Sequence, residues 1–348
     1  MATERWISSQ TRTPEEEALA FSLRPARLDE YVGQSDLVER LRIAIHAARE
    51  RGEALDHLLL HGPPGLGKTT LAHVIATEMG SAVHTTSGPA LTRGTDLVGA
   101  LTKLKPNDVL FIDEIHRLPV AVEEFIYPAM EDRRIDVAVD SGMNARTVTI
   151  KLQPFTLIGA TTRAGLLSAP LRSRFGLTHH LKYYPATDLY NILSRSARLL
   201  TIVSDADSLN AIASRSRGTP RIANRLLRRV RDYAQVRANG SFTERTVSEA
   251  LALEGVDELG LDELDRAYLK VIATTYKGGP VGLEAVAATM GDDAGTLEDV
   301  VEPYLLQIGF LARTRRGRQL TADAADYMGV ECANAVTATQ AALFEAGE

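Results

Sequence analysis

Cysteine is nearly absent from this sequence. Cys332 is the single cysteine among 348 residues, which excludes an internal disulfide framework and a metal site built from several cysteines. No apolar run approaches the ~18 residues of a membrane-spanning helix, and residues 1–20 have no apolar core like that of a signal peptide. The 45% hydrophobic and 24% charged content excludes a disordered chain, a collagen-like repeat and a coiled-coil rod. We expect a soluble, cytoplasmic protein of roughly two to three domains.

The sequence also lacks an overall excess of basic residues. Its net charge is −6, from 39 Lys and Arg against 45 Asp and Glu. Residues 186–255 depart from this balance, with eleven arginines against seven acidic residues, a local charge of +4. Because phosphate affinity depends on a local patch and not on the charge of the whole chain, DNA binding is not excluded.

Short apolar runs alternate with amphipathic segments from residue 23 to about 184. Buried strands are predicted at 57–60, 109–112 and 156–160, and helices at 40–51 and 68–79. Strands that alternate with helices predict a parallel α/β sheet covered on both faces. Within this pattern, 135–139 and 147–152 alternate apolar and polar residues around Ser141-Gly142, which predicts an inserted β-hairpin.

The rest of the chain has a different pattern. Residues 187–253 are predicted to be helical throughout. Helices at 263–276, 283–290 and 296–308 then precede a hairpin at 310–320 with Gly317 at its tip, the order of a winged helix-turn-helix. We therefore expect a large α/β domain at 1–184 with a loose leader at 1–22, a helical lid at 185–255, a winged-helix head at 256–330 and a tail at 331–348.

The strongest motif is a phosphate-binding loop, Gly62-Pro63-Pro64-Gly65-Leu66-Gly67-Lys68-Thr69, between a predicted strand and a predicted helix. Its glycines let several backbone N–H groups face a polyphosphate, beside a helix N-terminus. Lys68 is expected to reach the β- and γ-phosphates, and the Thr69 hydroxyl to ligate Mg²⁺. A Gly-rich turn that merely connects strand and helix does not explain the Lys-Thr pair.

Two further predicted strands end in polar residues at the edge where ligands collect. Asp113 is expected to be a partner of Mg²⁺, and Glu114 the base that orients the attacking water. The alternative is an acidic helix start favoured by the helix dipole. Thr162 follows the next strand and is expected to hydrogen-bond the water or the γ-phosphate, although a threonine capping a turn remains open.

Three arginine-bearing segments complete the candidate sites. Arg174 either faces solvent or reaches the nucleotide of a neighbouring subunit. Arg221 lies in the first turn of a predicted helix, where the dipole disfavours a cation, so an anionic partner or a surface ion pair is expected. The predicted hairpin tip could be a solvated turn or a phosphate-binding wing; its arginines are Arg313, Arg315, Arg316 and Arg318.

Together these motifs resemble the RuvB family, bacterial AAA+ motors of Holliday-junction branch migration. The resemblance covers about residues 23–329. The phosphate-binding loop alone indicates only an NTPase. The segments that begin at Gly218 and Gly278 and the arginine-rich wing are more specific to this family. The matching segments are GPPGLGKTT, DEIHRL at 113–118, YPAMED at 127–132, TLIGATTRAG at 156–165, RFG at 174–176, GTPRIANRLLRRVRDYA at 218–234, GGPVGLEAVA at 278–287 and EPYLLQIGFLARTRRGR at 302–318.

The resemblance implies a role for each matching residue. Arg313 and Arg318 would contact DNA phosphates. Arg174 would be the arginine finger offered to the next subunit, Arg221 the sensor from the lid, and Thr162 the sensor beside the Walker B pair, Asp113 and Glu114. Other implied nucleotide contacts are Leu23, Arg24, Tyr31, Val32 and Tyr184 at the adenine and ribose, Gly65, Gly67, Lys68, Thr69 and Thr70 at the phosphates, and Glu131, Asp132 and Arg133 approaching the neighbour's nucleotide.

The resemblance also implies ATP and Mg²⁺ as cofactors, a homo-hexameric ring on double-stranded DNA, RuvA docked on the hairpin 135–152, and RuvC as a further partner in recombination, DNA repair and the SOS response. The chain departs from the family pattern at Ser173, where relatives carry Asp, at the hairpin turn 141–144, and at Ala294, where some relatives place a basic residue. Arg315 is an additional wing arginine that could compensate for Ala294.

Two other functions fit part of the sequence. A nucleotide-switched winged-helix regulator would read a DNA sequence, but the wing tip has no Asn or Gln for base readout. An AAA+ protein remodeller or clamp-loader subunit would generally lack the winged helix. The motor remains the main hypothesis.

Overall fold

The computed structural model describes residues 22–138 and 147–330. Contacts within the chain divide it into two units. The sheet unit contains the described residues up to 192 together with 219–221, and the C-terminal unit contains 193–218 and 222–330. The predicted lid and head segments, which the sequence separates near residue 255, therefore share one unit.

The sheet unit is built on five parallel strands in the order β2-β3-β6-β1-β7. Their bounds are β1 Leu58–His61, β2 Val83–Ser87, β3 Val109–Asp113, β6 Thr156–Thr161 and β7 Leu177–His180. The three predicted strands are β1, β3 and β6, and they lie at the centre of the sheet. The edge strands β2 and β7 were not predicted, because their threonine and histidine residues form no apolar run.

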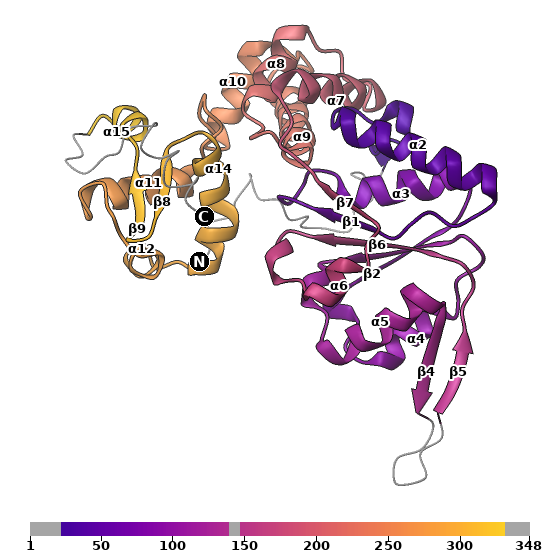
Figure 1. Ribbon diagram of the computed structural model, residues 1–348. Helices are drawn as coiled ribbons and strands as arrows, with labels where there is room; N and C mark the ends of the chain where they lie inside the picture. The colour runs from indigo at the N-terminus through magenta and orange to yellow at the C-terminus, as the bar shows by residue number, and fades with distance from the viewer. Residues whose placement is uncertain (1–21, 139–146, 331–348) are drawn as a thin grey trace. The chain divides into compact units, whose positions relative to one another are not determined.

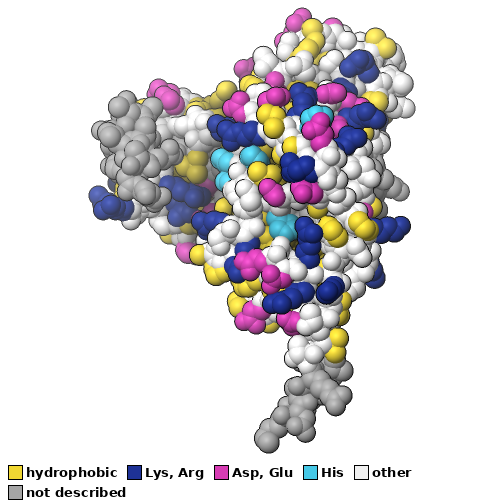
Figure 2. Space-filling model, turned by 45° about the vertical axis from the view of Figure 1, so that its right-hand side comes forward, with side chains coloured by type: hydrophobic (Ala, Val, Ile, Leu, Met, Phe, Trp, Pro, Cys, Tyr) yellow, Lys and Arg dark blue, Asp and Glu magenta, His cyan; other side chains and the backbone are white. Residues whose placement is uncertain are grey.

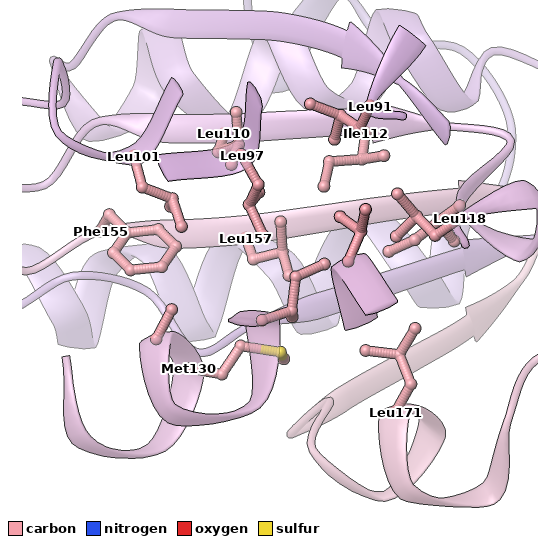
Figure 3. Close-up of a cluster of buried hydrophobic side chains, with 14 of the residues drawn as sticks. Leu91, Leu97, Leu101, Leu110, Ile112, Leu118, Met130, Phe155, Leu157 and Leu171 are labelled. Carbon is pink, nitrogen blue, oxygen red and sulfur yellow. The ribbon is translucent and has the colours of Figure 1, made fainter. Parts of the chain in front are cut away.

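Helices cover both faces of this sheet. In Figure 1, α2 (Ser35–Arg51) and α3 (Lys68–Met79) lie on one face, and α4 (Gly94–Leu101), α5 (Val120–Asp132) and α6 (Ala169–Ser173) on the other. Figure 3 shows the core beneath the second group, where Leu97, Leu110 and Leu157 meet Met130 of α5 and Leu171 of α6. Short 3₁₀ turns connect these elements; they are η1 Leu28–Glu30, η2 Gly88–Ala90, η3 Ile115–Arg117 and η4 Ala164–Leu166.

The predicted hairpin forms from β4 (Arg134–Ala138) and β5 (Thr147–Lys151), which pair antiparallel. It extends away from the five-stranded sheet (Figure 1). Within it, Val148 is a large apolar side chain that is 48% exposed. The turn residues 141–144 lie outside the described residues.

The C-terminal unit is helical with a small wing. Its first part holds α8 (Ala206–Ser214) and α10 (Glu244–Leu253), most of α9 (Pro220–Arg237) and the second half of α7 (Ala186–Leu199). Its second part holds α11 (Glu263–Thr274), α12 (Leu283–Met290), α13 (Ala294–Thr296), η5 (Leu297–Val301), α14 (Glu302–Gln307), β8 (Leu311–Thr314), β9 (Gly317–Leu320) and α15 (Ala322–Met328).

The helix predicted over 296–308 is present, but it is not α-helical throughout. This stretch is a short α-helix, a π-helical turn and a second α-helix. Pro303 has no N–H to donate to the carbonyl four residues earlier, so the α-helical ladder is interrupted there. The hairpin tip also differs slightly from expectation, since Arg315 and Arg316 form the turn and Gly317 begins β9.

A buried arginine joins the two parts of the C-terminal unit. Arg217 is 4% exposed; its Nε donates to the Gly260 carbonyl at 2.8 Å and its guanidinium pairs with Asp265 of α11. It also lies over the ring of Tyr304, 4.9 Å from the centroid. Because a buried charge is stable only when paired, these contacts hold the lid segment against the winged-helix segment.

Across residues 22–138 and 147–330, none of the helices combines the length and the apolar character needed to cross a membrane.

Candidate nucleotide and DNA sites

The phosphate-binding loop connects the carboxyl end of β1 to the N-terminus of α3. Gly65 and Gly67 have φ of +80° and +99°, a region that L side chains rarely adopt. A Cβ on Gly65 would lie 2.7 Å from Thr219 Cγ2. Lys68, Thr69 and Thr70 are the first three residues of α3, so their backbone N–H groups lie at the helix N-terminus. The backbone thus has the shape and polarity that suit a polyphosphate.

Lys68 is the buried cation of this loop. Its Nζ donates to the carbonyls of Gly62 and Pro63 at 2.7 and 2.8 Å, and the residue is 8% exposed. Burial lowers its pKa to about 8, and the charge of Arg221 acts in the same direction while Asp113 opposes it. The ammonium group is therefore poorly solvated and would gain from an added anion.

The lowered pKa predicts how nucleotide affinity depends on pH. A bound diphosphate favours the charged lysine, so its pKa rises on binding. Above pH ~8 the free protein has lost the proton that the complex needs, and ADP affinity should fall about tenfold per pH unit. Titrating ADP between pH 7.5 and 9.5 without Mg²⁺ measures this slope. Lys68→Arg stays protonated and should give a flat, weaker profile; a flat profile for the unaltered protein would contradict the assignment.

The carboxyl ends of β3 and β6 bring the second group of predicted residues to the edge of the sheet where the loop lies. Glu114 N donates to Asp113 Oδ1 at 2.9 Å, and Glu114 has left-handed backbone geometry with φ of +47°. The Glu114 carboxylate, 45% exposed, accepts from Arg117 at 2.9 Å. Thr162 is exposed directly after β6. Asp113, Glu114 and Thr162 therefore lie on the same edge of the sheet as the phosphate-binding loop.

Sequence reasoning missed a bridge between these two strands. Thr161, which is buried, lies with its Oγ1 2.9 Å from His116 Nδ1. This contact ties the turn after Glu114 to the end of β6. Thr161 and Thr162 are identical in type and adjacent, so the sequence offered no signal that one is buried and the other exposed.

Two tyrosines border the loop on its other side. Tyr184 donates to the Leu66 carbonyl at 3.2 Å, so its neighbour Tyr31, 3.1 Å away, donates to the Tyr184 hydroxyl. Leu23 is buried. A Cβ on Gly67 would lie 3.0 Å from the Tyr31 hydroxyl. The structure thus brings the predicted base-binding residues Tyr31 and Tyr184 to the phosphate-binding loop. Arg24 and Val32, which are partly buried, belong to the same N-terminal segment as Tyr31.

The structure places Arg174 at the C-terminus of α6. Its Nε lies 3.1 Å from Glu131 Oε1, and its Nη1 donates to the Pro170 carbonyl at 2.7 Å. Glu131, Asp132 and Arg133 are exposed at the end of α5, so this predicted group and Arg174 lie together in one chain. Arg221 N lies 3.4 Å from the Gly65 carbonyl, against the phosphate-binding loop.

The wing arginines fall into two groups. Arg315 and Arg316 are exposed at the tip. Arg313 and Arg318 bind Glu302, which is 0% exposed and also accepts from Tyr268 at 2.6 Å. Burial works to raise the pKa of Glu302, but its bonds from Arg318 and Tyr268 and the two arginine charges lower it overall. No local pattern indicates that Arg313 and Arg318 pair with a buried carboxylate, because Glu302 lies more than ten residues from both.

On the face shown in Figure 2, basic and acidic side chains are interspersed over the described surface. The overall charge distribution of this face therefore does not single out a DNA-binding surface. At the wing tip, Arg315 and Arg316 are adjacent and exposed, and such a local pair of cations is of the kind that binds a phosphate backbone.

Comparisons with known proteins agree with this arrangement. Three family models match the chain: "Holliday junction DNA helicase RuvB P-loop domain" at residues 23–181, "RuvB AAA lid domain" at 184–257 and "RuvB C-terminal winged helix domain" at 258–329. These matches confirm the fold class predicted from the sequence.

Individual relatives are similar over nearly the whole chain. The "Holliday junction branch migration complex subunit RuvB" of Myxococcus xanthus is 56% identical over 321 residues, 92% of this chain and 94% of the relative. That of Desulfosudis oleivorans is 57% identical over 311 residues, 89% of this chain and 91% of the relative. The solved structure of the Thermotoga maritima RuvB Holliday junction branch migration motor has a TM-score of 0.80 and 50% identity, covering 89% of this chain and 99% of that one. The chain belongs to the RuvB family of P-loop AAA+ ATPases.

Proposed function

We propose that this chain is an ATP-driven motor that moves duplex DNA and drives branch migration of Holliday junctions in recombination and repair. The observation that carries the proposal is the presence in one chain of a phosphate-binding loop, two carboxylates at the end of β3 on the same edge of the sheet, and a wing with exposed arginines. Phosphate contacts carry no base information, which suits a motor that must move any DNA sequence.

ATP would bind at the loop of the sheet unit. Leu23, Arg24, Tyr31, Val32 and Tyr184 would border the base and ribose, and Gly65, Gly67, Lys68, Thr69 and Thr70 would hold the phosphates. The described residues contain no group of three or more His, Cys, Asp or Glu side chains that could hold a metal. Mg²⁺ would therefore take few protein ligands, Thr69 and Asp113, as is common for this ion in phosphate sites; it would neutralise charge on the phosphates.

The remaining residues would complete the reaction. Glu114 would orient the attacking water and Thr162 would contact the water or the γ-phosphate. Arg174 from an adjacent subunit, with Glu131, Asp132 and Arg133 beside it, would stabilise charge on the transferring phosphoryl group. Arg221 would report the nucleotide to the lid. This division of labour requires a ring, and we propose a homo-hexamer on double-stranded DNA in the cytoplasm.

We further propose the domain limits 1–184, 185–255 and 256–330, followed by a tail at 331–348. RuvA would dock on the hairpin 135–152, to which the exposed Val148 contributes apolar surface, and RuvC would join during resolution. At the wing, Arg315 and Arg316 would contact phosphates directly, with Arg313 and Arg318 beside them.

The test is movement of a synthetic four-way junction with ATP, Mg²⁺ and RuvA. The double variant Arg315→Ala, Arg316→Ala should keep ATP turnover without DNA but lose junction movement. Because each phosphate contact contributes about 0.9 to the salt dependence of duplex binding, the log–log slope should fall by roughly 1.8. The matched control, Arg237→Ala with Arg245→Ala, removes two exposed arginines from α9 and α10.

Three results would redirect the proposal. If ATP is hydrolysed but the junction does not move, the ATPase survives and the motor does not. A protected operator sequence would favour the regulator. Full activity of the wing double variant would contradict the role of Arg315 and Arg316.

A further inference from the structure

One face of α5 carries three polar residues at helical spacing. Glu123, Tyr127 and Glu131 are each four positions apart, so their side chains lie in a row along the helix. We call this row the α5 ladder. Tyr127 was not among the residues predicted to act, and neither was Glu123, although a buried carboxylate in a helix needs a reason.

Glu123 fixes the first part of the ladder. It is 7% exposed, and its Oε2 accepts from the hydroxyls of Tyr127 at 2.7 Å and Ser168 at 2.6 Å. Ser168 is the N-cap of α6, where its own Oγ accepts from Leu171 N at 3.3 Å. A single carboxylate oxygen therefore links the ring of Tyr127 to the start of the helix that carries Arg174.

Arg174 completes the link at the other end of α6. Its guanidinium carbon lies 4.4 Å from the centroid of the Tyr127 ring, a distance typical of a cation–π contact. Its Nε and the Glu131 carboxylate are 3.1 Å apart but lack hydrogen-bond geometry, so this is an ion pair. The guanidinium therefore lies against the ring of one ladder residue and the charge of another, and its side chain is 23% exposed.

Both helices are anchored in the same core. Val122, Ile126, Ala129 and Met130 of α5 and Leu171 of α6 belong to one cluster of buried side chains (Figure 3). The ladder faces α6 from a rigid element, which is what accurate presentation of a long side chain needs. An arginine without such contacts would sample many rotamers.

We propose that Tyr127, held by Glu123, is a positioning residue that presents the Arg174 guanidinium to the nucleotide site of an adjacent subunit. The inference rests on the proposed function of Arg174. The ring restricts the guanidinium to one place, and the hydroxyl bond to Glu123 restricts the ring. Glu131 keeps the cation paired within its own chain, where the phosphates of an adjacent site can compete for it.

The first experiment measures steady-state ATP turnover by the full-length chain with Tyr127→Leu, Tyr127→Phe and Arg174→Ala. Tyr127→Leu removes the ring face, so kcat should fall about tenfold while KM for ATP stays within about twofold. Tyr127→Phe keeps the ring and should lose about threefold or less. Arg174→Ala removes the guanidinium itself, so its loss of kcat is the largest that a defect in positioning Arg174 could cause.

Mixing subunits separates positioning from damage. When Tyr127→Leu chains are mixed with Glu114→Gln chains, the latter present an intact Arg174 to the sites of the former. Turnover per Tyr127→Leu chain should then rise. A defect confined to the chain's own site would not respond to mixing, and that result would overturn the proposal.

Glu123 gives a matched pair of variants. The hydroxyls of Tyr127 and Ser168 both donate to Glu123 Oε2, so the amide oxygen in Glu123→Gln can still accept both hydrogen bonds. Glu123→Gln should therefore keep most of the turnover that Glu123→Met loses. Glu124→Met, exposed on the same helix, is the control for the substitution itself. Equal losses in Glu123→Gln and Glu123→Met would contradict the hydrogen-bond link.

The outcomes distinguish this inference from the function on which it rests. If Arg174→Ala retains turnover, the proposed finger fails, and the inference with it. If Arg174→Ala abolishes turnover but Tyr127→Leu matches the unaltered chain in kcat, the finger stands and the positioning role of Tyr127 is overturned.

Discussion

Replacing Arg174 with Ala is expected to reduce ATP turnover by about 10³- to 10⁵-fold, the contribution of an arginine finger to phosphoryl transfer. The loss should fall on kcat, because charge on the transferring phosphoryl group grows only in the transition state. ATP binding should persist, since the phosphate-binding loop and the tyrosines lie in the chain's own sheet unit. Fluorescent-nucleotide titration beside steady-state turnover separates the two effects.

Arg174→Lys tests whether charge alone suffices. Lysine keeps the cation but loses the planar fork and stacks less well on an aromatic ring, so most of the activity should remain lost. Arg49→Ala removes an exposed arginine from α2 and serves as the control. Turnover of Arg174→Ala within tenfold of the unaltered chain would remove Arg174 from the reaction and leave it as an ion-pair partner of Glu131.

The central part of the fold follows from local sequence. Apolar runs predicted β1, β3 and β6 to within a residue or two, and the phosphate-binding loop follows from its glycines and Lys68. The edge strands β2 and β7 could not be predicted in this way. A strand that is paired on one side only needs fewer apolar residues, and β7 ends in His179 and His180. Pro303 lies within the predicted helix, and the π-helical turn that precedes it was not predicted.

Candidate site residues divide in the same way. Lys68, Asp113 and Glu114 belong to local sequence motifs at the ends of predicted strands, so their common location at one edge of the sheet was predictable. Contacts between distant positions were not: Glu302 pairs with Arg318 sixteen residues away, and Glu123 bonds Ser168 forty-five residues away. The sequence does not show whether a carboxylate is buried or exposed, because burial depends on how distant segments pack.

Replacing Glu114 with Gln is the second large prediction. The amide cannot take a proton from the attacking water, so kcat should fall by about 10²- to 10⁴-fold. The fold should be unaffected, because the amide oxygen can still accept from Arg117, which now donates to Glu114 Oε2 at 2.9 Å. Stability to urea should match that of the unaltered chain.

Bound ATP should therefore persist in Glu114→Gln, and a filter-binding assay with radiolabelled ATP, followed by analysis of the bound nucleotide, measures it. Lys68→Ala is the contrasting variant, since it removes the cation of the loop and should lose binding itself. If Glu114→Gln releases ADP as fast as the unaltered chain, Glu114 is not the base, and its ion pair with Arg117 would be its whole role. If both variants lose binding equally, the carboxylate holds nucleotide instead of activating water. Only retained ATP with lost turnover places Glu114 on the reaction coordinate, because that pattern requires an effect confined to the transition state.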